Sequence, residues 1–461
     1  MIVVDSIFSV HKEFIKAEIN SENELFELVS NAEIELNDLV PEFQLGIICR
    51  RLMRMPVTGK LDFSKSMLWT FFSLLKSSTS KASIVSSQSK VLLIQNSLKY
   101  HFRSLIEPLV GQIERETDIA VVSEKTLNGT KVDDWIGDWT PFMVFSTLFF
   151  ALRNSKTIQK RLSELGFIIP RNKIIQELFI QLSMYRGLFN WLKRGQYELI
   201  VVDTDRGNFF STLVCAASQK LNIRTVSLQH GVVDMGFGYY PVIADQIWCW
   251  GNFSKKRFSV FGVDESRIKM VGNPTAKFKT KNNDKMSYTI GFGFSGHHPE
   301  KEQIMVENLL AFEPLSRFKV MLKLRPSVAA KPWMIEHPRL QIYKTVSQLN
   351  ANELFFQEID ILITTVSSIG PETVMSGVPI WIYRLTNNSE RFDNLLIETG
   401  HFPDISSDEI LRKETKTLVQ EGKIYLNQLL EKQTGYLMTE YFEATGKSAT
   451  QNIVKLINTE L

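Results

Sequence analysis

The residue best placed for proton transfer is His230, which follows an apolar run in the motif Gln229-His230-Gly231. A histidine at the carboxyl end of a parallel strand faces the crevice in which α/β proteins bind ligands. Because its pKa lies near neutrality, it could act as a general base on an acceptor hydroxyl, or orient an acceptor or a phosphate. A structural interpretation, in which His230 caps the strand through backbone hydrogen bonds, fits the motif equally well.

A second candidate base is Asp205, or its neighbour Asp203, in the motif Asp203-Thr204-Asp205-Arg206-Gly207-Asn208 after the apolar run 199–202. Carboxylates often accept the proton of an attacking hydroxyl group. The same residue could instead cap the helix expected to begin near Asn208. Both interpretations stay open from the sequence.

An anion site is predicted where the strand expected over 359–363 leads through Thr365, Ser367 and Ser368 into Gly370-Pro371-Glu372. Free backbone N–H groups and small hydroxyl residues at a helix start can hold a phosphate or diphosphate. Proline suits the first helical turn. The alternative is an ordinary capped helix, because serine before proline is a common helix opening.

Two further segments could contact the same anion. Lys323 and Arg325 follow the strand expected over 318–322, and either cation could neutralise a phosphate. Gly293, Ser295 and His298 follow the run 288–292, where glycine allows close backbone approach to a ligand. A solvated basic loop and a simple glycine-rich turn are the competing interpretations. His297 and His298 lack a third ligand at metal spacing, so no metal site is expected.

The order of short motifs in residues 197–384 resembles bacterial GT-B glycosyltransferases of capsule and lipopolysaccharide assembly. That group includes Kdo transferases, sialyltransferase-like enzymes and CDP-glycerol glycerophosphotransferases. The motifs are Gln229-His230-Gly231, Tyr239-Tyr240-Pro241, Ala244-Asp245, Trp250-Gly251 and Val271-Gly272-Asn273-Pro274. The resemblance implies a nucleotide-sugar donor and a glycan or lipid-linked glycan acceptor. It also implies that Glu372 bonds the donor ribose, with the phosphate at the helix start.

One position departs from this pattern. Such enzymes usually carry a His-Pro pair where this chain has Arg325-Pro326. Arginine binds phosphate bidentately but cannot transfer a proton at neutral pH, so acid catalysis from this position is not expected. Ser367-Ser368 resembles the CMP-sugar group, whereas Arg325 departs from it. The choice between CMP and UDP or GDP therefore stays open.

The same resemblance bears on stereochemistry. Retaining GT-B enzymes often carry a second glutamate one or two helical turns before the ribose-binding one, and this chain has Thr364 and Thr365 there. An inverting reaction is expected. The Asp-rich metal motif of the other main glycosyltransferase fold is absent from the sequence, so no metal or other cofactor is expected.

Short apolar runs alternate with helix-length segments in two series, which predicts parallel, doubly wound sheets. The expected fold class is α/β of GT-B type: two Rossmann-like domains facing across a cleft, with a mostly helical N-terminal extension. The expected boundaries are an extension over 1–85, an acceptor domain over 86–275 with a helical insertion at about 130–195, and a donor domain over 276–461. The C-terminal helices could cross back to the first domain.

Composition narrows the functional class. The 461 residues are 44% hydrophobic and 22% charged, and a net charge of +3 gives no support for nucleic-acid binding. Cys49, Cys215 and Cys249 form no CxxC motif, which favours a reducing compartment, with Cys215 and Cys249 in the core. No basic, apolar leader follows Met1, so a cytoplasmic location is expected.

One apolar stretch, from Trp139 to Leu152, is shorter than the ~20 residues of a membrane-spanning helix. Many basic residues follow it between Arg153 and Arg194. This combination suits peripheral contact with the anionic face of the inner membrane, and 50–54 with 67–72 repeats it. A buried core helix beside solvated charges is the alternative.

Two other classes of function remain compatible with the sequence: a different enzyme on the same scaffold and a non-catalytic binding protein. A glycerophosphotransferase or a nucleotide-sugar epimerase could use the same scaffold, although the diglycine loop and tandem glutamates usual in the epimerases are missing. A non-catalytic protein that binds glycan or nucleotide within an assembly complex is the third hypothesis. It would keep its role after substitution of His230.

Overall fold

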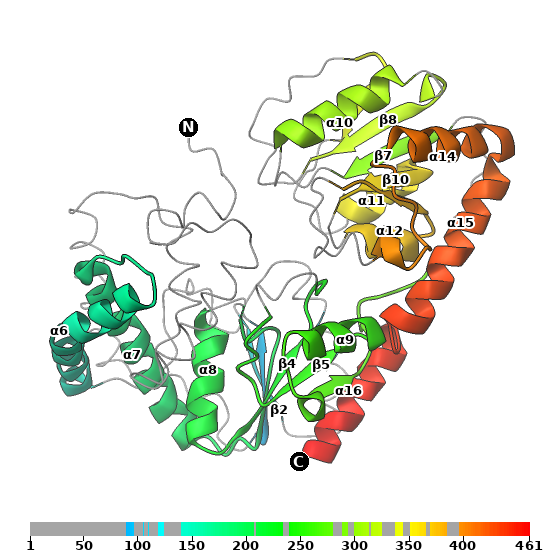
Figure 1. Cartoon of the computed structure of the whole chain (residues 1–461). Helices are drawn as coiled ribbons and strands as arrows, with labels where there is room; N and C mark the ends of the chain where they lie inside the picture. Colours follow the sequence, from blue (N-terminus) through cyan, green and yellow to red (C-terminus); the bar gives the residue numbers. More distant parts are fainter. Residues whose placement is uncertain are drawn as a thin grey trace.

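Short runs of apolar residues form the strands of two parallel sheets in the computed structural model of the chain (Figure 1). In β3 all four residues are buried, because helices cover both faces of a parallel sheet. The structure describes residues 89–95, 105, 109, 119–123, 140–206, 209–233, 239–279, 288–293, 299–312, 315–324, 337–343, 351–365, 369–384 and 396–461. The predicted extension over 1–85 lies outside these ranges.

The first sheet has six strands in the order β2-β1-β3-β4-β5-β6, and every neighbouring pair is parallel. The strand order reverses between β1 and β3. Its strands are β1 (Val91–Gln95), β2 (Ile119–Ser123), β3 (Leu199–Val202), β4 (Arg224–Leu228), β5 (Gln246–Cys249) and β6 (Ile268–Met270). The helices among them are α6 (Pro141–Glu164), α7 (Arg171–Arg194), α8 (Phe209–Lys220), α9 (Asn252–Val260) and the short η2 (Glu265–Arg267).

The second sheet has five parallel strands in the order β11-β10-β7-β8-β9, with the reversal between β7 and β10. Its strands are β7 (Thr289–Gly293), β8 (Lys319–Lys323), β9 (Leu340–Tyr343), β10 (Ile361–Thr364) and β11 (Ile380–Ile382). The helices that connect them are α10 (Pro299–Ala311), α11 (Ala351–Glu358) and α12 (Ile369–Met375).

Two doubly wound parallel sheets make two Rossmann-like domains, which is the architecture of the GT-B class. The predicted fold class is therefore confirmed. A reversal of strand order is where such sheets bind ligands, outside the carboxyl ends of the strands. The topology thus marks one candidate position in each domain, between β1 and β3 and between β7 and β10.

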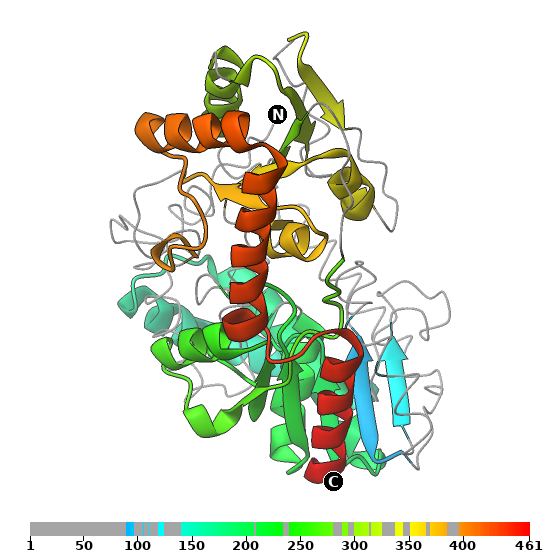
Figure 2. The ribbon, with the colours of Figure 1, turned by 90° about the vertical axis from the view of Figure 1, so that its right-hand side faces the viewer.

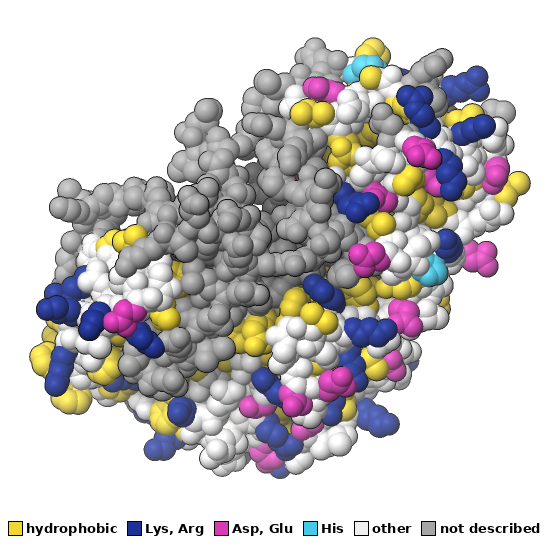
Figure 3. Space-filling model, viewed as in Figure 1, with side chains coloured by type: hydrophobic (Ala, Val, Ile, Leu, Met, Phe, Trp, Pro, Cys, Tyr) yellow, Lys and Arg dark blue, Asp and Glu magenta, His cyan; other side chains and the backbone are white. Residues whose placement is uncertain are grey.

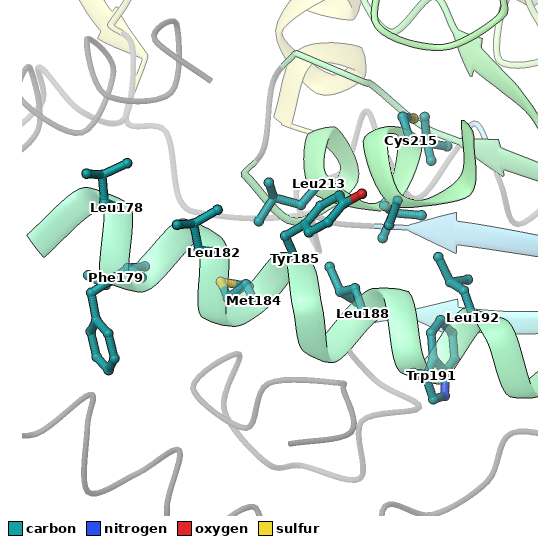
Figure 4. Packing of buried hydrophobic residues seen from close by; sticks show 14 of the residues in the cluster. Leu178, Phe179, Leu182, Met184, Tyr185, Leu188, Trp191, Leu192, Leu213 and Cys215 are labelled. Atoms are coloured by element: carbon teal, nitrogen blue, oxygen red, sulfur yellow. The ribbon is translucent and has the colours of Figure 1, made fainter. Parts of the chain in front are cut away.

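The helices α6 and α7 form a hairpin beside the first sheet and share its largest hydrophobic core. Thr140 caps α6 by accepting the Met143 N–H at 3.3 Å, and Pro141 begins the first turn. Figure 4 shows side chains of α7 in this core together with Leu213 and Cys215 of α8. Both described cysteines, Cys215 and Cys249, are buried and free, which confirms their predicted place in the core.

The C-terminal segment runs from the second domain to the first, as Figure 2 shows. It consists of α14 (Asp408–Glu421), α15 (Lys423–Tyr436), the π-helical turn η4 (Leu437–Tyr441) and α16 (Gly446–Glu460). Three apolar residues of α16 lie in the core of the first sheet with Trp248, namely Ile453, Val454 and Ile457. The Glu460 carboxylate accepts hydrogen bonds from Arg224 at 2.8 Å and from Gln246 at 3.1 Å. The last helix of the chain therefore completes the first domain.

Among the described residues, no helix combines the length and the hydropathy that a bilayer-spanning segment requires.

Candidate functional site

Three predicted donor-site residues lie together at the carboxyl end of the second sheet. Gly293, the last residue of β7, pairs with Thr364 of β10 on one side and with Lys323 of β8 on the other. Thr365 directly follows Thr364. Because β7 and β10 flank the reversal of strand order, these residues stand where an open α/β sheet binds its ligand.

Glu372 is in the first turn of α12, which follows β10. Its Oε2 accepts a hydrogen bond from the Asn352 side-chain amide, on α11, at 2.8 Å. Burial raises the pKa of the Glu372 carboxyl group, while the Asn352 bond and the positive charge of Lys323 act in the opposite direction. The fold thus holds a partly desolvated carboxyl group close to a buried cation at the strand ends.

Thr365 brings a hydroxyl group to this position. The residue is buried, and its Oγ1 has no hydrogen-bond partner within the described part of the chain. Buried polar atoms in folded proteins are nearly always hydrogen-bonded, so a group without a partner indicates a place for a ligand or a water molecule. The Thr365 hydroxyl group is therefore available to a bound anion.

The two glycines of β7 have different roles. A Cβ atom on Gly291 would lie 2.5 Å from Ile359 Cδ1, so this position requires glycine for packing between sheet and helix. A Cβ atom on Gly293 would have no neighbour nearer than 3.5 Å, which is ordinary van der Waals contact. Of these two glycines, only Gly293 fits the predicted role in ligand approach, and that role stays a prediction.

Five predicted donor-site residues lie outside the described residues, namely Ser295, His298, Arg325, Ser367 and Ser368. Their roles stay predictions. Within the described ranges, no group of three or more His, Cys, Asp and Glu side chains is arranged to hold a metal ion.

In the first domain, the side chain of Gln229 fixes the turn that carries His230. Gln229 Nε2 donates to the Gly231 carbonyl at 2.8 Å, and its Oε1 accepts the Trp250 N–H at 2.8 Å. The half-buried His230 ring stacks on Tyr239, with ring centroids 4.8 Å apart. The turn presents an oriented imidazole at the end of β4. Its role as general base stays a prediction.

Asp205 occupies a different environment from the one expected of a catalytic base. It is buried, and one carboxylate oxygen accepts the backbone N–H groups of Ile243 at 2.7 Å and Ala244 at 2.9 Å. The other oxygen accepts the Ser227 hydroxyl group at 3.1 Å. Burial raises the pKa of Asp205, and these hydrogen bonds and Arg206 partly oppose that rise. This geometry favours a structural role, in which Asp205 holds the segment before β5 against the end of β3.

Two of the motifs that carry the sequence resemblance are contact points for the C-terminal segment. A Cβ atom on Gly272, where φ is +89°, would lie 2.2 Å from the Ala444 carbonyl oxygen. One on Gly251 would lie 2.7 Å from the Tyr441 carbonyl oxygen. The Asn273 N–H donates to the Ala444 oxygen at 2.9 Å. The glycines of Trp250-Gly251 and Val271-Gly272 therefore allow the segment between α15 and α16 to cross the first sheet.

Sequence reasoning missed Asn352. It lies 20 residues before Glu372 in the chain, in the first turn of a helix where polar residues are common. No motif surrounds it, so only the fold reveals that its amide orients the Glu372 carboxylate.

The chain matches no protein-family model and no curated protein. Solved structures resemble it at low identity. A Listeria monocytogenes protein assigned as a UDP-N-acetylglucosamine 2-epimerase has 15% identity and a TM-score of 0.48, covering 82% of this chain and 98% of its own. The Neisseria meningitidis UDP-GlcNAc 2-epimerase bound to UDP-GlcNAc has 10% identity and a TM-score of 0.47, covering 80% and 99%.

A third structure is HepE of Anabaena in complex with UDP and glucose, with 11% identity and a TM-score of 0.47 over 81% of this chain and 100% of its own. Glycosyltransferases such as the lipopolysaccharide outer core galactosyltransferase WaaB also match, with a TM-score of 0.44. Similarity at this level does not distinguish between these activities, so function has to be argued from the residues.

Proposed function

We propose that this protein is an inverting, metal-independent glycosyltransferase that moves a sugar from a nucleotide-sugar donor to a bacterial surface glycan acceptor. One observation carries the proposal. Gly293, Lys323, Thr365 and the Asn352–Glu372 pair converge where the strand order of the second sheet reverses. An acid, a cation and an open hydroxyl group at that position match the ribose and phosphates of a nucleotide.

Each residue has a distinct role in the proposal. The Glu372 carboxylate accepts hydrogen bonds from the ribose hydroxyl groups, while Lys323 and Thr365 contact the phosphates. The sequence adds Ser295, His298, Arg325, Ser367 and Ser368 as further predicted phosphate contacts. Charged donors and acceptors make stronger hydrogen bonds than neutral ones, so Glu372, Lys323 and the predicted contact Arg325 supply most of the affinity for the nucleotide-sugar donor.

In the proposed reaction, the acceptor hydroxyl group attacks the anomeric carbon from the face opposite the nucleotide. The new C–O bond forms as the bond to the phosphate oxygen breaks, and the phosphate leaves with its charge neutralised by Lys323. The acceptor proton passes to His230, which is the predicted base. Asp205, with both oxygens occupied, holds the neighbouring segment instead of taking this proton.

Thermal-shift titration with CMP, UDP, GDP, CDP and TDP tests the donor site. A nucleotide that binds the folded state raises the melting temperature by mass action. We expect one nucleotide to raise it, and Glu372→Ala to abolish the rise. Glu353→Ala is the matched control, because the Glu353 carboxylate pairs with Lys279 at 3.0 Å on the surface.

The sugar conjugate of the selected nucleotide then separates transferase from epimerase by NMR. A transferase leaves the donor intact until an acceptor glycan is added, whereas an epimerase converts it without acceptor. Conversion without acceptor would replace the transferase proposal. If no nucleotide shifts the melting temperature, the donor-site assignment is wrong.

A further inference from the structure

Helix α6 carries an exposed face that is apolar in its first half and basic in its second. Four large hydrophobic side chains are unusually exposed there: Phe142 at 80%, Phe145 at 55%, Phe149 at 66% and Leu152 at 44%. Arg153, Lys156 and Lys160 follow and are also exposed. At 100° per residue, all seven fall within about 100° of the helix circumference.

The opposite face of α6 packs in the hydrophobic core of the first domain. Val144, Ala151, Ile158 and Leu162 are buried against the core shared with α7. The exposed stripe therefore contributes nothing to this core. Single exposed hydrophobic residues are common on protein surfaces, but a contiguous stripe with three phenylalanines marks an interaction site.

The charges around α6 indicate the partner. Of the basic residues near it, Arg171 and Arg186 are engaged within the hairpin. Arg171 donates to Ser155 at 2.9 Å, and Arg186 donates to Thr147 at 2.8 Å. Arg153, Lys156 and Lys160 remain on the exposed face. Lys160 forms an ion pair with Glu164 at the helix end, but this pair is long, with 3.9 Å between Nζ and Oε1, and both side chains are exposed. Figure 3 shows hydrophobic and basic side chains together over the α6 end of the molecule.

We propose that α6 is an interfacial helix that docks the first domain onto an anionic lipid bilayer. Its three phenylalanines and Leu152 insert among the acyl chains, while Arg153, Lys156 and Lys160 contact the lipid phosphates. Aromatic side chains beside a basic surface are the signature of helices that lie in the membrane interface. The exposed apolar half spans residues 142–152, about 15 Å along the helix, which is too short to cross a bilayer.

The docking surface is inferred from the residues of α6 alone, whereas its connection to a lipid-linked acceptor rests on the proposed transferase function. Docking through α6 would hold the first domain, which carries His230, at the membrane that contains the acceptor. The second domain, with its donor site, would stay accessible to a water-soluble nucleotide sugar. The sequence left a buried core helix as the alternative for residues 139–152, and the exposure of Phe142, Phe145 and Phe149 favours the membrane.

Vesicle co-sedimentation of the full chain tests the proposal, with pure phosphatidylcholine compared with phosphatidylcholine containing phosphatidylglycerol. We expect binding to the anionic vesicles, weakened by salt. The triple variant Phe142→Ser, Phe145→Ser, Phe149→Ser should bind them about tenfold or more weakly. Its matched control is Val260→Ser, Ile424→Ser, Met438→Ser, which removes equally exposed apolar residues elsewhere and should leave binding unchanged.

Charge removal gives a second, independent measurement. Arg153→Gln, Lys156→Gln and Lys160→Gln should each lower the affinity for anionic vesicles by about fivefold. The control is Lys413→Gln, Lys416→Gln, Lys455→Gln, at exposed positions of α14 and α16. Binding of the α6 variants at wild-type strength would overturn the proposal.

Two other results would also overturn it. A change in oligomeric state of the phenylalanine variant would show that a second copy covers the stripe. A lower melting temperature of the phenylalanine variant would show that another segment of this chain covers it. The nucleotide-induced thermal shift is measured without lipid, so loss of that shift with retained vesicle binding would refute the proposed function and leave this inference standing.

Discussion

The chemistry of Glu372 depends on two neighbours from other elements. Asn352 donates a hydrogen bond to its carboxylate, and the charge of Lys323 favours its ionised form. Burial acts against both and raises the pKa above the ordinary value for glutamate. The ionised carboxylate is the form that accepts hydrogen bonds from a ribose, so its protonation should control nucleotide binding.

Nucleotide affinity should therefore fall as the pH drops into the acidic range, and the fall should begin at a higher pH than for an ordinary glutamate. Asn352→Ala should move this fall to a still higher pH, because the lost hydrogen bond had lowered the pKa of Glu372. Dissociation constants measured across a pH series test this. A profile that Asn352→Ala leaves unmoved would contradict the assigned pair.

His230 should matter for turnover and not for donor binding. His230→Ala is expected to reduce transfer about 10²- to 10⁴-fold, the usual contribution of a general base, with the nucleotide dissociation constant unchanged. His401→Ala is the control, because His401 also stacks on a tyrosine, Tyr436, but lies beside the C-terminal helices. Full activity of His230→Ala would make His230 a structural residue.

Asp205→Ala should destabilise the protein. It leaves the Ile243 and Ala244 N–H groups without their acceptor, which costs on the order of 3 kcal/mol for two unsatisfied buried donors. Because burial raises the pKa of Asp205 above its unfolded value, its contribution is fully present below the unfolded pKa and declines as the pH rises through the folded one.

The difference in unfolding free energy between wild type and Asp205→Ala should therefore be largest at acidic pH and become smaller as the pH rises. Urea denaturation of both proteins at several pH values measures it. A stable variant with reduced turnover would instead restore the predicted catalytic role of Asp205.

At the scale of elements, the sequence predicted the strands well and their contacts poorly. Buried parallel strands read as short apolar runs, so β3, β7 and β10 could be located from composition alone. Trp250-Gly251 and Val271-Gly272 belong to the motifs that carry the GT-B resemblance, yet their glycines contact backbone atoms some 170–190 residues later in the chain. A contact between residues so far apart along the chain leaves no pattern in the local sequence.

The crossing segment can be tested through Gly272. Gly272→Ala should destabilise the protein by about 2–4 kcal/mol, because φ is positive and the Cβ atom would overlap the Ala444 carbonyl group. Gly435→Ala in α15 is the control. Its Cβ atom meets nothing within 4 Å, and alanine should stabilise that helix by about 0.5–1 kcal/mol. Equal melting temperatures for the two variants would contradict the assigned contact.

The exposed face of α6 illustrates another limit of the sequence. Residues 139–152 are mostly apolar, and composition cannot say which of them face a neighbouring helix. The packing of α7 on one face decides this, because it buries Val144 and Ala151 and leaves Phe142 and Phe149 exposed. Likewise, Asn352 enters the candidate site only because α11 and α12 flank the same strand.

At the scale of the whole molecule, the C-terminal helices connect the two domains. α15 packs in the second domain, while α16 buries Ile453 and Ile457 against the first sheet. The C-terminal helices therefore link the proposed donor site, at the end of the second sheet, to the domain that carries His230 at the end of β4. The proposed division assigns donor binding to the second domain and acceptor and membrane contact to the first.

Isothermal titration of the nucleotide selected by thermal shift tests the central claim most directly. The claim is that a nucleotide binds at the carboxyl ends of β7 and β10, where the strand order reverses, with Glu372 as its anchor. Removing a hydrogen bond to a charged group costs about 1.5–3 kcal/mol, so Glu372→Ala should weaken binding roughly 10- to 150-fold while Glu353→Ala binds as wild type. Equal dissociation constants for wild type and a folded Glu372→Ala protein would contradict the account.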